Sequence, residues 1–156
     1  MKVLITTVPF AEKNLLPIEL LDGVEAEYLI NPLNKKLTEN ELAEMAQGFD
    51  VIIAGTEPIT DYVMERAGSL KMISRVGIGL DSVDLVAAKR RGIKVSYTPD
   101  APAPAVAELT IGLLITLLRS VQLSNIEMHK GQWKRYFGKR IANTTIGIIG
   151  LGRVGV

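Results

Sequence analysis

DVIIAGTEPITDYVMERAGSLKMISRVG, at residues 50–77, carries the pattern on which the fold of this chain depends. Its first apolar run, DVIIAG (50–55), is typical of a buried strand. ITDYVMERAG (59–68) follows with the apolar spacing of a helix, and LKMISRVG (70–77) is a second strand-like run that ends in glycines. A strand, a helix and a strand in this order predict a βαβ unit with two parallel strands.

The same alternation extends in both directions from this unit. The further predicted strands are KVLIT (2–6), EAEYLI (25–30) and IKVSY (93–97), and the further helices are TENELAEMAQGF (38–49) and VDLVAAKRRG (83–92). The expected N-caps are Thr38, with Glu41 as its capping-box partner, then Thr60 or Asp61, and Asp81 or Ser82. The pattern predicts an α/β fold with a doubly wound, flavodoxin-like parallel sheet that carries helices on both faces.

Composition excludes several classes of site. The net charge is +1 and cysteine is absent, so nothing favours a nucleic-acid partner, and disulfides and thiolate chemistry are excluded. The single histidine, His129, falls at a predicted helix end, which argues against a zinc site or a Ser-His-Asp triad. The longest uncharged apolar run, LTIGLLITLL (109–118), is shorter than the ~20 residues that span a bilayer. We expect a cytoplasmic chain with no metal and no membrane partner.

The composition changes at TPDAPAPA (98–105), where the prolines rule out a helix interior or a central strand. We place a domain boundary here. Beyond it, apolar residues recur at helical spacing and predict one long helix over 105–130 that is apolar on more than one face. A polar loop (131–144) then leads to a predicted terminal strand at TIGIIG (145–150).

A glycine-rich motif, GLGRVG (150–155), directly follows this terminal strand. It matches the G-x-G-x-x-G fingerprint, in which the glycines allow a tight turn, close approach of a pyrophosphate, and close packing of helix and strand. The candidate cofactor-binding residues are Gly150, Gly152, Arg153, Val154 and Gly155. The alternative is an ordinary strand-to-helix turn, because the acidic residue expected about 20 positions later lies outside the sequence.

A second glycine-rich turn, SRVGIGLDSVD (74–84), lies between a predicted strand and a predicted helix. Open α/β folds bind ligands at the carboxyl edge of the sheet, so the amides of this turn could hold an anion. The alternative is a simple connection in which glycine allows close packing, and these residues alone leave both interpretations open.

In this order, the pieces resemble the D-isomer-specific 2-hydroxyacid dehydrogenases, in particular their phosphoglycerate dehydrogenase branch. The matching stretches are AGTEPIT (54–60), SRVGIGLDSVDLVAAKRRGIKVSYTPD (74–100), VAELTIGLLITLLR (106–119), GQW (131–133) and TIGIIGLGRVG (145–155). The family has two doubly wound domains with the active site between them. The resemblance implies that residues 1–98 are most of the substrate-binding domain. It implies that residues 99–156 are the hinge, the connecting helix, a dimer-forming arm and the truncated start of a Rossmann-type NAD-binding domain.

The resemblance also implies roles for single residues. Arg75, Val76 and Gly77 would bind the substrate, with the amides of Val76 and Gly77 on its carboxylate, and Ile78 would lie beside the nicotinamide. The family's catalytic arginine, glutamate and histidine match no residue of this sequence, so we expect no catalytic residue in the chain. Some members hold a phosphorylated substrate with a basic residue near the positions of Ala54 and Gly55, and its absence here argues against 3-phosphoglycerate.

The function implied by the resemblance is that of an NAD-dependent oxidoreductase, with NADP as a further possible cofactor. It would move a hydride between the nicotinamide and C2 of a small 2-hydroxy or 2-oxo acid, as a homodimer through residues 105–144. We expect this chain to be a piece of such an enzyme and inactive by itself. The alternative is a stand-alone flavodoxin-like ligand-binding or regulatory module.

Overall fold

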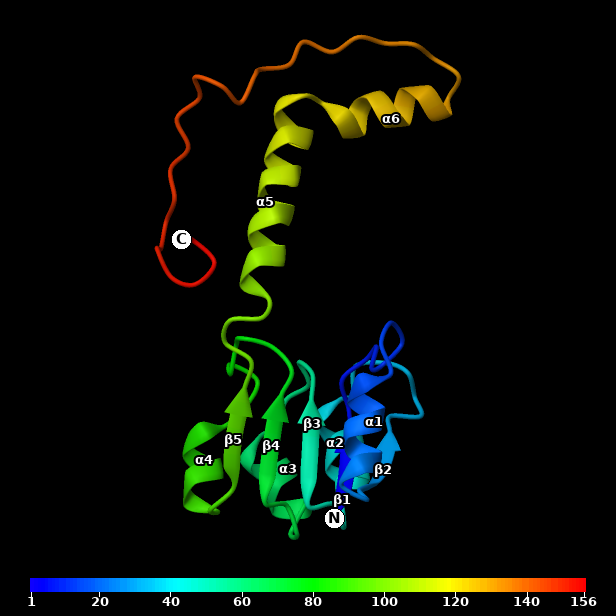
Figure 1. Cartoon of the computed structure of the whole chain (residues 1–156), viewed down its shortest axis with the longest axis vertical. Helices are drawn as coiled ribbons and strands as arrows, with labels where there is room; N and C mark the ends of the chain where they lie inside the picture. The colour runs from blue at the N-terminus through cyan, green and yellow to red at the C-terminus, as the bar shows by residue number, and fades with distance from the viewer. The chain divides into compact units, whose positions relative to one another are not determined.

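A computed structural model describes residues 1–156 and shows one parallel sheet of five strands (Figure 1). The strands are β1 (Lys2–Ile5), β2 (Glu27–Ile30), β3 (Val51–Ala54), β4 (Met72–Arg75) and β5 (Lys94–Tyr97). They lie in the order β2-β1-β3-β4-β5, and each neighbouring pair is parallel. The predicted α/β fold with a parallel sheet is confirmed, and these strands form within their predicted bounds.

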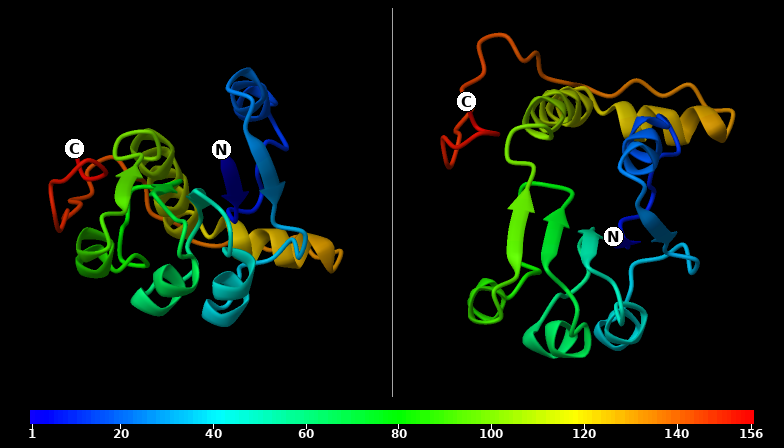
Figure 2. Two further views of the ribbon diagram at one scale, coloured as in Figure 1. Left: turned by 90° about the horizontal axis from the view of Figure 1, so that it is seen from below. Right: turned by 60° about the horizontal axis from the view of Figure 1, so that its bottom comes forward.

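Four helices accompany the sheet: α1 (Leu16–Gly23), α2 (Glu39–Met45), α3 (Asp61–Arg66) and α4 (Leu85–Arg90). The helices α2, α3 and α4 cover one face, and α1 lies on the other, as the views in Figure 2 show. The sheet is therefore doubly wound. Helix α1 was not predicted from the sequence, because its N-cap residue, Leu15, has no capping side chain and none of the helix residues is buried.

The main core lies between the sheet and the helices α2, α3 and α4. Ile52 of β3 and Ile73 of β4 are fully buried there, together with Leu42 of α2 and Val63 of α3. Burial of each such side chain stabilises the fold by about 1.5–3 kcal/mol relative to exposure. This packing fixes the positions of the strands, and with them the loops at the carboxyl edge of the sheet.

The helix N-caps follow two of the three predictions. Thr38 caps α2, and Thr60, one of the two candidates, caps α3 by accepting a hydrogen bond from the amide of Val63. Helix α4 differs: its cap is Asp84, which corrects the prediction of Asp81 or Ser82. The reason is an isolated parallel bridge between Ile59 and Val83, which fixes Val83 outside the helix, directly before Asp84.

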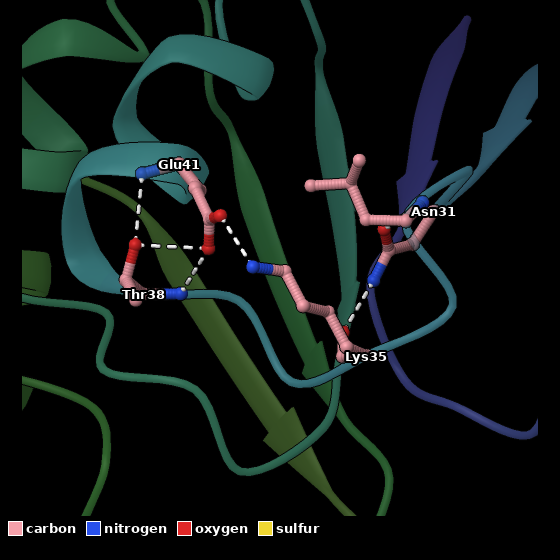
Figure 3. Close-up of polar contacts among 5 residues, drawn as sticks. Asn31, Lys35, Thr38 and Glu41 are labelled. Carbon is pink, nitrogen blue, oxygen red and sulfur yellow. Dashed lines mark hydrogen bonds and ion pairs between the residues drawn. The ribbon is translucent and has the colours of Figure 1, made fainter.

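A capping box begins helix α2 (Figure 3). The amide of Glu41 donates to Thr38 Oγ1, and the amide of Thr38 donates to Glu41 Oε2 at 2.9 Å. Lys35 Nζ lies 2.6 Å from Glu41 Oε1. The hydrogen bond from Lys35, followed by those from Thr38, lowers the pKa of Glu41 to about 2.

We expect Glu41→Ala to destabilise the chain at neutral pH and to lose this effect in acid. The folded pKa of Glu41 is about 2, below the unfolded value of about 4.3. The contribution of the carboxylate is therefore complete above about pH 4.3 and is lost as the pH falls toward 2. Urea unfolding of both proteins across this range should show their free energies of unfolding converging. A difference that stays constant with pH would contradict the assignment, and Glu44→Ala, an exposed change on the same helix, is the control.

The chain divides into two compact units, Met1–Pro99 and Asp100–Val156. The second unit contains two helices, α5 (Ala103–Leu118) and α6 (Val121–His129), which are bent by 66° at their junction. The single helix predicted over 105–130 is therefore wrong. Ser120 at the junction adopts a left-handed conformation with φ of 52°, and the amide of Lys139 donates to the carbonyl oxygen of Leu118 at 2.9 Å.

Helix α5 begins earlier than predicted, at Ala103, with Pro104 in its first turn. Proline is tolerated there because amides of the first turn need no partner within the helix. Leu109, Leu113 and Leu117 on this helix are more than half exposed. No single helix is long and apolar enough to cross a membrane. Helices α5 and α6 have sufficient length and apolar content only when the two are taken together as one bent segment.

Residues 145–150, predicted as a strand, form no strand in this chain. Ile149 is fully exposed, and the sheet contains only β1 to β5. A strand needs a neighbour to satisfy its backbone groups. Without one, the apolar sequence of this segment is not sufficient to form a strand.

Candidate functional site

The inner strands β1, β3 and β4 all end at the same edge of the sheet (Figure 1). The residues that follow them line a small cavity. Its volume is about 150 Å³. The lining residues come from three strand ends and one loop: Thr6, Thr7, Val8, Lys36, Gly55, Thr56, Glu57, Arg75 and Val76. Open α/β folds bind ligands at this edge.

Arg75, the last residue of β4, is 9% exposed. Its Nη1 donates to the carbonyl oxygen of Val76. Its Nε makes no hydrogen bond, and it is the one side-chain nitrogen or oxygen in the chain that is both inaccessible to solvent and without a partner. A buried donor without a partner costs free energy. A guanidinium in this state, in the wall of a cavity, suits a carboxylate or another anion.

The backbone amides of the turn after Arg75 have hydrogen-bond partners within the chain. The amide of Val76 donates to the carbonyl oxygen of Ala54 at 2.8 Å, which continues the ladder between β3 and β4. The amide of Gly77 donates to Thr98 Oγ1 at 2.8 Å. Both amides expected to hold a carboxylate thus have partners within the chain. A hydroxyl group is easily rotated away, so the amide of Gly77 is the more readily released of the two.

Gly77 has two reasons to be glycine. Its φ of +141° is a conformation that other residues rarely adopt, and a Cβ at this position would collide with the guanidinium of Arg75, 2.9 Å from its Cζ. The arginine therefore lies directly against the backbone of the turn. Ile78, the next residue, is 38% exposed.

Glu57 adds a buried carboxylate to the cavity. It is 2% exposed and lies in the connection between β3 and α3. Its Oε1 accepts a hydrogen bond from the amide of Gly55 at 2.9 Å and another from Thr6 Oγ1. The chain thus holds this side chain from two strand ends that are far apart in the sequence.

The fingerprint glycines lie in the second unit and form a compact turn. Gly150 has a φ of +92°, and the amide of Gly155 donates to the carbonyl oxygen of Gly152 at 3.0 Å. A Cβ on Gly155 would collide with the carbonyl oxygen of Gly150. Arg153 Nε lies 2.6 Å from Asp100 Oδ1. Glycine is thus required at the first and third positions of the motif, and Val154 follows Arg153 in the same turn.

Comparison with known proteins assigns the chain to a family. Residues 6–149 match the model of the catalytic domain of the D-isomer specific 2-hydroxyacid dehydrogenases. The chain belongs to this family. The resemblance inferred from the sequence is therefore confirmed.

Individual relatives show how much of a dehydrogenase this chain covers. D-3-phosphoglycerate dehydrogenase from Methanocaldococcus jannaschii is 41% identical over 123 residues, which are 76% of this chain and 23% of that protein. Hydroxypyruvate reductase from Thermotoga maritima is 37% identical over 125 residues, 78% of this chain and 41% of that protein. The crystal structure of NAD⁺-bound 3-phosphoglycerate dehydrogenase from Entamoeba histolytica matches with a TM-score of 0.81 at 29% identity, over 99% of this chain and 48% of that one. The chain spans less than half the length of these relatives.

The structure brings some candidate residues together and adds others. Arg75, Val76, Gly77 and Ile78 share one turn, and the fingerprint residues 150–155 share another in the second unit. Sequence reasoning missed Glu57, although a charged residue so close to the end of a buried strand is a usable signal. It also missed Thr6, whose contact with Glu57 joins positions separated by 51 residues.

Proposed function

We propose that this dehydrogenase chain supplies the substrate-binding part of an oxidoreductase that uses a nicotinamide cofactor. The reaction is hydride transfer between the cofactor and C2 of a small 2-hydroxy or 2-oxo acid. The observation that carries this proposal is Arg75, which lines the cavity at the carboxyl edge of the sheet and contains a buried Nε without a hydrogen-bond partner. A 2-hydroxy acid always presents a carboxylate, and that group matches this donor.

In this proposal Arg75 and the turn that follows it hold the substrate. The guanidinium binds the carboxylate, and the amide of Gly77 exchanges Thr98 Oγ1 for a carboxylate oxygen. The amide of Val76 stays in the sheet ladder and acts by fixing the turn. Ile78, the next residue of the turn, is assigned to cofactor contact. No residue of this chain is assigned to proton transfer.

The cofactor part of the proposal assigns the pyrophosphate to the fingerprint turn. Gly150 and Gly155 fit this role because neither position accepts a side chain, and a Cβ on Gly152 would meet no other atom of the chain. Arg153 and Val154 supply the neighbouring amides. The nicotinamide, when bound, accepts or donates the hydride. The NAD⁺-bound relative supports this class of cofactor. NAD is the proposed form, and the proposal does not depend on the choice between NAD and NADP.

We further propose that residues 1–98 are the substrate domain and that residues 105–144 form a homodimer contact. The exposed leucines of α5 supply the apolar surface for this contact. An apolar patch of this kind is unusual on a soluble monomer. Sedimentation velocity at micromolar concentration should show a dimer, and a compact monomer over the whole concentration range would refute the assignment.

Catalysis should require more than these residues. We expect the 156-residue chain to show no saturable binding of NADH by fluorescence and no reduction of 2-oxo acids. The gene product read in frame through any codons that follow Val156 should reduce at least one 2-oxo acid with NADH. Activity that copurifies with the 156-residue chain would show that a complete site exists within it. A stop codon directly after Val156 in the native gene, with no activity, would favour the stand-alone module.

A further inference from the structure

The cavity at the carboxyl edge of the sheet contains opposite charges that do not neutralise each other. Arg75 and Glu57 are both buried and both line it, yet the ion pairs of the chain all involve other residues. Buried charges in proteins are ordinarily paired, because burial without a partner is costly. Two separated charges in one cavity of about 150 Å³ therefore suit a ligand that carries an acceptor at one end and a donor at the other.

The two oxygens of Glu57 have different surroundings. Oε1 accepts the hydrogen bonds from the amide of Gly55 and from Thr6. Oε2 accepts none within the chain and approaches the α-carbon side of Gly55, where a Cβ would lie 2.9 Å from it. The first oxygen fixes the carboxylate in place, and the second is left as an acceptor at the cavity. Glycine at position 55 leaves space beside this oxygen that a Cβ would occupy.

We infer that Glu57 selects 2-hydroxy or 2-oxo acids that carry a further hydroxyl group and rejects those in which that hydroxyl is phosphorylated. This inference rests on the proposed function, in which Arg75 holds the carboxylate. With the carboxylate on Arg75, the far end of a three-carbon acid lies beside Glu57, which lines the same cavity. A hydroxyl there donates to Glu57 Oε2, and this acceptor makes Glu57 a specificity-determining residue.

A phosphate at the same position would meet a buried negative charge. A phosphate monoester carries about −1.5 to −2 charges at neutral pH, and it offers acceptor oxygens where Glu57 requires a donor. Lys36 also lines the cavity, but its side chain is exposed and its charge is screened by water. The buried carboxylate acts through a lower dielectric, so its repulsion outweighs the attraction of the lysine.

The test is an NMR titration of the chain. The ¹H–¹⁵N signals of Arg75 Nε and of the Gly55 amide report binding. The probes are D-glycerate, glycolate, which lacks the second hydroxyl, and 3-phospho-D-glycerate. The dissociation constant of glycerate should be about tenfold lower than that of glycolate, the effect of one charge-assisted hydrogen bond. It should also be at least about tenfold lower than that of 3-phosphoglycerate.

Glu57→Gln tests the carboxylate itself, because glutamine keeps the size of the side chain and an oxygen for Gly55 and Thr6. In this variant glycerate should lose its advantage over glycolate, and 3-phosphoglycerate should bind about tenfold more tightly than to the unchanged chain. Glu44→Gln removes one charge from the exposed face of α2 and should leave all three constants unchanged. Thermal unfolding of both variants checks that the fold is kept.

The outcomes separate this inference from the proposed function. If 3-phosphoglycerate binds the unchanged chain as tightly as glycerate does, or if Glu57→Gln leaves the order of affinities unchanged, the role of Glu57 is wrong. If no acid shifts the signals of Arg75 or Gly55, the inference fails, whether or not the longer gene product reduces 2-oxo acids. If the expected order is found but the longer product has no dehydrogenase activity, the proposed function fails and the selectivity of the cavity stands.

Discussion

Replacement of Arg75 by leucine is expected to lower kcat/KM for a 2-oxo acid in the active gene product by about 10²–10³-fold, the usual cost of removing one partner of a buried charge pair. Stability should behave differently. The guanidinium buries an Nε with no hydrogen bond, so its removal relieves a desolvation cost in the unliganded protein. We therefore expect the midpoint of thermal unfolding to stay unchanged or to rise.

Two further variants test whether the effect comes from the geometry and the position of the Arg75 guanidinium. Arg75→Lys keeps the charge but loses the planar arrangement of donors, so its kcat/KM should lie between those of the original protein and Arg75→Leu. Arg66→Leu removes the same charge from the exposed part of α3 and should leave kcat/KM within a factor of about two. If the Arg75→Leu variant retained its kcat/KM, the carboxylate would have to bind elsewhere. Lower stability with retained activity would make Arg75 a purely structural residue.

Gly77→Ala should both destabilise the chain and abolish binding of a carboxylate at Arg75. The φ of +141° is strained for alanine, which costs about 1–3 kcal/mol in the free energy of unfolding. The added Cβ would also collide with the Arg75 guanidinium, so the arginine must move. Urea unfolding measures the first effect, and loss of the glycerate-induced shift of the Arg75 Nε signal measures the second.

Gly112→Ala is the matched control, because a Cβ at this position in α5 meets no other atom. Alanine is favoured over glycine in a helix interior by about 0.5–1 kcal/mol, so this variant should be as stable as the original chain or more so. If Gly77→Ala were equally harmless, the close contact between the turn and Arg75 would not exist in solution.

The sheet could be predicted from the sequence because each of its strands is a short apolar run bounded by polar or turn-forming residues. Local signals also located the caps at Thr38 and Thr60. They were wrong at Asp84, since the pairing of Ile59 with Val83 is a contact between distant segments that no local pattern reports. The break at Ser120 was missed for a related reason: serine adopts a left-handed conformation only where the surroundings impose it.

The site was less accessible to prediction than the fold. The turn containing Arg75 was identified through family resemblance, whereas the state of its amides depends on Ala54 and Thr98, on neighbouring strands. The role of Glu57 follows from a hydrogen bond across 51 residues to Thr6. Such contacts arise from the order of the strands, which the alternation of elements suggests but does not determine.

Because the cavity lies at the ends of inner strands, the backbone amides around it should exchange with deuterium at different rates. β1, β3 and β4 each have a hydrogen-bonded strand on both sides, whereas β2 and β5 lie at the edges. Backbone amides in such inner strands exchange with deuterium only through large-scale opening. The amides of Thr6 and Val76 extend these ladders, so they should exchange almost as slowly as the core. The amide of Gly77, bonded to a side chain, should exchange much sooner. A ligand would therefore bind to a donor that is released quickly, the amide of Gly77, next to inner strands whose hydrogen bonds rarely open in the folded state.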